Sequence, residues 1–105
     1  MKKIGIDEGK VMMDNAGVLG RALHSSPEVV IIHVTVQPGS FIKPHVTPVD
    51  VEFFVLEGNG TFLHGEESME AGQGTLLPCP RGVPHGITNA GPGILRVLVV
   101  QNPRQ

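Results

Sequence analysis

The chain has 105 residues and a formal net charge of −2, so it is long enough for one domain around a single core. Eight Lys and Arg residues against ten Asp and Glu residues leave no basic excess for a phosphate backbone, and no Trp or Tyr is present to stack on exposed bases. The composition therefore argues against nucleic acid as a partner. It also argues against a membrane span, because apolar runs such as Val97 to Val100 are far shorter than the roughly 20 residues that a membrane helix needs.

The first ten residues and the cysteine content indicate in which cellular compartment the protein is expected. Cys79 is the only cysteine and cannot form an internal disulfide, and the opening MKKIGIDEGK lacks the apolar run of a signal peptide. We therefore expect a reducing, cytoplasmic environment.

The N-terminal region is the least regular part of the sequence. Residues 1–28 are expected to form an arm with strands that joins a barrel over residues 29–105 in one domain. Within residues 1–19, the segment MMDNAGV has weak periodicity, which fits an edge strand, an arm exchanged with a partner or a loop.

The rest of the chain predicts an all-β fold. Fourteen Gly and nine Pro residues leave almost no room for helix, since both residue types destabilise helix interiors and favour turns. Segments rich in Val, Ile, Leu, Phe and Thr alternate with these turn residues. The predicted strands, in chain order, are residues 19–24, 29–37, 51–56, 61–64, 75–77, 85–89 and 94–101.

The apolar content of two of these strands predicts that the chain forms a homodimer. Residues 29–37 and 94–100 are largely apolar on both faces, whereas a strand with one wet face would alternate. One face fills the interior of the barrel, and we expect the other to pack on a second subunit in a twofold homodimer.

Two motifs with fixed spacing identify a known architecture. In the segment GTLLPCPRGVPHGITN, the fixed positions Gly-x5-Pro-x-Gly-x2-His-x3-Asn are filled by Gly74, Pro80, Gly82, His85 and Asn89. This pattern resembles the second motif of the small single-domain cupins, which are RmlC-like double-stranded β-helix (jelly-roll) barrels.

The first motif of that family is half filled. Gly39 and His45 match its opening, but Thr47 stands where the second His belongs and Val51 stands where the acid belongs. The resemblance covers about residues 29–100 and implies a divalent transition metal (Zn, Ni, Fe, Mn or Co) held by His45 and His85.

Further ligands would have to complete such a site, because a catalytic zinc normally has three protein ligands and a structural zinc four. The candidates are Thr47, Asp50, Glu52 and His33. A regular strand would aim both acids away from the face that carries Val51, Phe53 and Val55, while a bulge near Pro48 would reverse this. His33 could instead be a hydrogen-bonded residue at the surface or at an interface and not a metal ligand. Val51, Phe53 and Val55 are expected to line the cavity.

Three functions remain open. The family resemblance implies a metal-dependent protein acting on a small carboxylate, sugar or phenolic substrate, with oxygenase, isomerase or lyase chemistry if it is an enzyme. The alternatives are a metal-free small-molecule-binding module with an apolar cavity, and a dimeric structural or regulatory partner of another protein.

Overall fold

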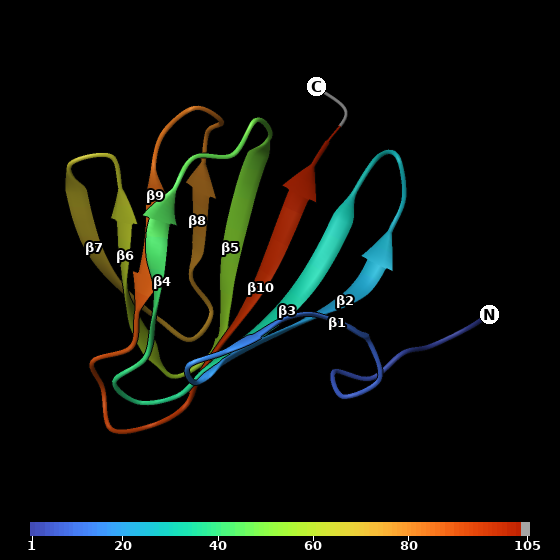
Figure 1. Cartoon of the computed structure of the whole chain (residues 1–105), viewed down its shortest axis with the longest axis horizontal. Coiled ribbons are helices and arrows are strands. Elements are labelled where there is room, and N and C mark those ends of the chain that lie inside the picture. Colours follow the sequence, from blue (N-terminus) through green and yellow to red (C-terminus); the bar gives the residue numbers. More distant parts are fainter. Residues whose placement is uncertain (104–105) are drawn as a thin grey trace.

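The computed structural model describes residues 1–103, and in this range the chain forms ten strands and no helix, in particular none that could cross a membrane (Figure 1). The strands form a six-stranded sheet in the order β1-β2-β3-β10-β5-β8 and a four-stranded sheet in the order β4-β9-β6-β7. Their bounds are β1 Lys10–Asn15, β2 Val18–Ser25, β3 Val30–Val36, β4 Phe41–His45, β5 Asp50–Glu57, β6 Asn59–His64, β7 Glu67–Gly72, β8 Leu76–Cys79, β9 His85–Thr88 and β10 Leu95–Asn102. The predicted all-β jelly-roll fold is confirmed; the last two residues of the predicted barrel segment lie outside the described range.

The two sheets face each other as a sandwich, as Figure 1 shows. A closed barrel was expected, but within residues 1–103 the sheets are not joined edge to edge by strand pairing. Two of the edge strands contain a proline, Pro44 in β4 and Pro78 in β8. Because proline has no N–H to donate to a ladder, it suits an edge where pairing stops.

The core lies between the inner faces of the two sheets and is mainly aliphatic. Along β5 the side chains alternate, so that Val51, Phe53 and Val55 are buried while the intervening Glu52 and Phe54 are half-buried on the outer face. Strand β10 repeats this pattern with Leu95, Val97 and Val99 inside. The period of two places every second residue of these strands against the four-stranded sheet.

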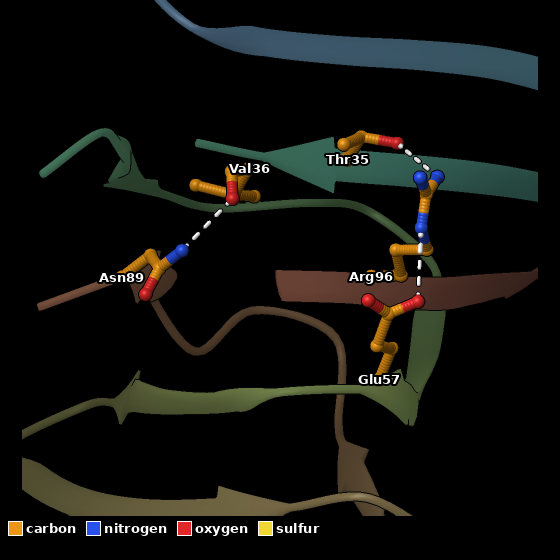
Figure 2. A network of polar contacts seen from close by, with 5 residues as sticks. All are labelled: Thr35, Val36, Glu57, Asn89 and Arg96. Atoms are coloured by element: carbon orange, nitrogen blue, oxygen red, sulfur yellow. Dashed lines mark hydrogen bonds and ion pairs between the residues drawn. The ribbon is translucent and has the colours of Figure 1, made fainter. Parts of the chain in front are cut away.

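The second motif contributes to the fold through Asn89. This side chain is fully buried, and its Nδ2 donates to the carbonyl oxygens of Val36 and Gly93 at 2.9 Å each, while its Oδ1 accepts from the Gly91 N–H at 3.1 Å. Figure 2 shows the bond to Val36, which ties the end of β9 to β3. Asn89 is therefore a structural residue that fixes the turn between β9 and β10.

The other end of the motif holds the loop that leads into β9. Gly82 has φ of 79°, a left-handed conformation that favours glycine, and its N–H donates to the carbonyl oxygen of Thr47 at 3.1 Å. This bond joins the loop before His85 to the loop after His45, so the two halves of the sequence pattern meet in space.

The N-terminal region forms a hairpin with its own chain. Ala16 and Gly17 both have positive φ, at 49° and 84°, as in the tight turns that join antiparallel strands. Strand β1 pairs with β2 through a bulge at Met12 and forms one edge of the six-stranded sheet. Of the three options for this segment, the structure has the edge strand.

Candidate functional site

A cavity of about 110 Å³ lies between the two sheets. Its floor and walls come from the inner face of the large sheet, including Ile32, Val34 and Val99, and from β4 and β9 of the small sheet. The polar side chains that line it are His45, His85 and Gln101. The cavity is therefore apolar with a small number of polar groups, which is the usual character of a small-molecule site.

The two motif histidines meet in this cavity. They are direct cross-strand partners on β4 and β9, with ring centroids 4.6 Å apart and planes tilted by 59°. His45 is exposed at the edge of the cavity and His85 is buried, with only 2 % of its surface accessible. Two imidazoles that are 40 residues apart in the chain thus lie side by side because the strands pair in this register.

The local sequence explains how β4 reaches His85. The β4–β9 ladder shifts register between Ile42 and His45, and β4 runs very close to β9 at Gly86. A Cβ on Gly86 would lie 2.9 Å from both the Ile42 oxygen and the Pro44 nitrogen. Glycine at this position therefore permits the approach that brings His45 over His85.

One hydrogen bond of His45 indicates which of its ring nitrogens is the donor. Its Nδ1 lies 3.1 Å from the carbonyl oxygen of Lys43. A carbonyl oxygen only accepts, so Nδ1 is the donor in this contact, and in the uncharged form of the ring the lone pair then lies on Nε2. His45 thus offers a hydrogen-bond acceptor to a group in the cavity.

The environment of His85 keeps it neutral. Burial lowers its pKa below the ordinary 6.5, and the neighbouring His45 and, more weakly, His64 act in the same direction, while a backbone contact with Val83 partly opposes them. Its buried Nδ1 has no hydrogen bond of good geometry. A neutral ring has one donor nitrogen and one acceptor nitrogen, so His85 has polar capacity left for a ligand.

His64 is the other cross-strand neighbour of His85. It does not line the 110 Å³ cavity; it lines a separate space of about 180 Å³ together with Cys79. Burial raises the pKa of the Cys79 thiol, which favours its protonated form. The position of His64 beside His85 follows from the pairing of β6 with β9, and no pattern in the sequence predicts it.

The other candidate ligands do not line the cavity. The Thr47 hydroxyl donates to the Val49 oxygen at 2.9 Å, and Asp50 Oδ1 accepts from the Arg81 N–H at 2.8 Å. Glu52 lies on the outer face of the large sheet, where its Oε1 accepts from Asn102 at 3.2 Å. His33 also lies on that outer face, between Arg21 and Leu98 of the neighbouring strands.

The described residues therefore supply an incomplete ligand set for a metal. Over residues 1–103, no group of three or more His, Cys, Asp or Glu side chains is arranged to hold an ion. His45 and His85 alone would leave at least two positions of a tetrahedral ion to water or substrate.

The apolar lining combines expected and unexpected residues. Val51 and Phe53 line the cavity, whereas Val55 lies further along the same face in the core. Met12 and Met13 of β1 also line it. The bulge at Met12 explains why two consecutive residues reach one cavity, and a regular strand would have separated them.

Comparison with known proteins agrees with this architecture. Residues 32–101 match the family described as the cupin domain. No match was found among curated proteins. One similar structure is TT1209 from Thermus thermophilus, at 28% identity over 84% of this chain and 85% of that one, with a TM-score of 0.79.

Two further structures share the fold over nearly the whole chain. The polyketide cyclase RemF from Streptomyces resistomycificus is 25% identical, covering 99% of this chain and 80% of its own, with a TM-score of 0.84. KdgF from Halomonas sp. is 19% identical, covering 99% of this chain and 96% of its own, with a TM-score of 0.86. With two facing antiparallel sheets, a filled second motif and a family match over two thirds of its length, this chain belongs to the cupin family.

Proposed function

We propose that this chain binds a small molecule between its two sheets, with the polar group of that molecule contacted by His45 and His85. The observation that carries the proposal is the pairing of these imidazoles in a largely apolar cavity of about 110 Å³. An apolar space with a few convergent polar groups gives both affinity and orientation. The two motif histidines are then ligand-binding residues.

The chemistry of the pair favours hydrogen bonding over ion pairing. The low pKa of His85 leaves its ring neutral near pH 7, and the bond from His45 Nδ1 to Lys43 leaves Nε2 as an acceptor. The protein can therefore orient an O–H or N–H group of the ligand. His45 is also placed to accept a proton from it if a reaction follows.

The experiment is a titration of the isotope-labelled full chain, followed by NMR, with small alcohols, phenols and carboxylic acids of four to eight heavy atoms. We expect at least one of them to shift the amide signals of residues around the cavity, in particular Gly86 and Ile87. We expect His85→Ala to weaken this binding at least tenfold. His24→Ala is the matched control, since His24 is exposed on β2 away from the cavity. A panel in which no compound shifts the cavity signals would contradict the proposal.

A divalent metal at the same pair is a second candidate. The 4.6 Å separation of the two rings, which both line the cavity, favours it, and a bound ion would supply Lewis-acid chemistry. Elemental analysis of protein purified without chelators tests it directly. If the ion is held by this pair, the parent protein contains a near-stoichiometric amount of Zn, Ni, Fe, Mn or Co. The double variant His45→Ala, His85→Ala then contains none. A metal content near zero in the parent protein would exclude this candidate.

A further inference from the structure

The size of the cavity suits a ligand with a single ring. A cavity of about 150 Å³ in another protein takes up one benzene molecule. The space between the sheets here is about 110 Å³ and borders the exposed residues His45 and Met12. One six-membered ring with a small substituent is therefore close to the size of this space, and a second fused ring would have to extend past His45 and Met13 into an adjoining space of about 760 Å³.

The walls of the cavity favour a flat, unsaturated ring. At one end Phe53 meets His85 nearly edge-on, with centroids 5.4 Å apart and an interplanar angle of 65°. The bulge in β1 adds Met12 and Met13 to the lining, where they are 56 % and 40 % exposed. Aromatic rings pack well edge to face, and methionine sulfur makes favourable contacts with ring edges.

The polar groups select the substituent. Two of the three polar lining side chains, His45 and His85, lie side by side on the small sheet, Gln101 lies on β10 of the large sheet, and the lining contains no Asp, Glu, Lys or Arg. A hydroxyl group, with one donor and two acceptor sites, matches such a pair of imidazoles. A carboxylate ion has no proton to donate to His45 Nε2 and would be desolvated with no lining cation to pair with it. A sugar would place several hydroxyl groups against Ile32, Val34 and Val99 without partners.

We infer that the ligand of this site is a monocyclic phenol, with its hydroxyl on the His45–His85 pair and its ring between Phe53 and the two methionines. This inference rests on the proposed function and adds the chemical class of the ligand. It assigns Met12 and Met13 as residues that set the preference for an aromatic ring.

The test compares four probes that differ in one property each, by NMR titration of the full chain. Phenol is the predicted ligand, cyclohexanol keeps the hydroxyl but loses the aromatic ring, benzoate keeps the ring but carries a charge, and 2-naphthol adds a second ring. We expect phenol to bind at the cavity at least tenfold more tightly than each of the other three. Equal or tighter binding of cyclohexanol, benzoate or 2-naphthol would overturn the inference while leaving the proposed function intact. No binding by any of these or by the wider panel would overturn both.

A variant separates the aromatic preference from simple packing. Met12→Leu with Met13→Leu keeps the apolar volume close to that of the parent and removes both sulfur atoms. We expect the ratio of phenol to cyclohexanol affinity to fall at least threefold, with cyclohexanol affinity nearly unchanged. Met69→Leu, at an exposed position on β7, is the control and should leave the ratio as in the parent. An unchanged ratio in the double variant would remove the methionines from the inference.

Discussion

Asn89 shows how a motif residue can serve the fold rather than the ligand. Its side chain satisfies two carbonyl oxygens and one N–H across the turn between β9 and β10 and does not line the cavity. Asn89→Asp keeps the shape but cannot donate to the oxygens of Val36 and Gly93, so we expect the free energy of unfolding to fall by about 2 kcal/mol or more. Urea denaturation of the variant and its parent measures this. A change under about 0.5 kcal/mol would show that these bonds do not stabilise the turn.

A substitution at Gly20 is expected to raise the stability of the fold and to weaken ligand binding. It lines the cavity on β2, and the nearest heavy atoms to a new Cβ would be 3.5 to 3.8 Å away, which is ordinary contact. We expect Gly20→Ala to stabilise the fold by about 0.5 to 1 kcal/mol, because alanine loses less backbone entropy on folding. The same methyl group occupies cavity volume, so phenol affinity should fall.

The control for this variant is Gly93→Ala, where no heavy atom lies within 4 Å of the new Cβ. It should leave phenol affinity unchanged. If Gly20→Ala binds phenol as tightly as the parent does, the ligand does not occupy the space in front of β2.

His33 gives the protein a dependence of stability on pH. Burial lowers its pKa below 6.5, the nearby Arg96 acts in the same direction, and Asp7 partly opposes them. The unfolded chain therefore binds a proton as the pH falls through 6.5, while the folded chain does so only at lower pH. The stability that depends on neutral His33 is complete above pH 6.5 and is lost as the pH falls toward the folded pKa.

We expect the free energy of unfolding to decrease between about pH 7 and pH 5, and to decrease less steeply in His33→Gln. Urea melts at several pH values provide the measurement, with His24→Gln at an exposed position as the control. If His33→Gln shows the same slope as the parent, His33 is not buried in its neutral form.

At the scale of elements, the seven strands with strong β-branched and aromatic content could be predicted to within two residues. Strand β1 was one of three options for its segment, and β4 and β7 were not predicted. Strand β4 reads FIKPH, and its proline argues against a strand except at an edge, which is where it lies. Strand β7 reads ESMEAG, which has little β propensity and forms a strand by pairing along the whole of β6.

The residues of the candidate site could be predicted only in part, because some of them take their positions through strand pairing and a bulge. The spacing of the motifs identifies His45 and His85, and the alternation in DVEFFVLE places Val51 and Phe53 on one face. Met12 and Met13 enter through a bulge, and His64 lies beside His85 through cross-strand pairing. Bulges and pairings between distant strands leave no period in a single sequence.

At the scale of the whole molecule, the outer face of the large sheet remains partly apolar. Leu76, Phe54 and Leu98 form one row across β8, β5 and β10, and Leu76 is 55 % exposed. The Arg96–Glu57 ion pair lies beside this row on β10 and β5, so the face carries both charge signs and can complement a copy of itself. We propose that a second copy of the chain covers this face in a twofold dimer.

Sedimentation at tens of micromolar tests this assembly. We expect a mass close to twice the 11.2 kDa of one chain, and a single-chain mass for Leu76→Glu. Met69→Glu has the same 55 % exposure but lies on the four-stranded sheet, and it should remain dimeric. A monomeric parent protein would contradict the proposal.

The proposed function requires His45 and His85 to hold the polar group of a small ligand inside the sandwich. A crystal structure of the protein soaked with phenol tests it most directly. We predict density for one ring between Phe53 and Met13, with the hydroxyl oxygen within hydrogen-bonding distance of His45 Nε2. Density for phenol only at the outer surface, or an empty cavity at a phenol concentration that saturates binding in solution, would contradict the account.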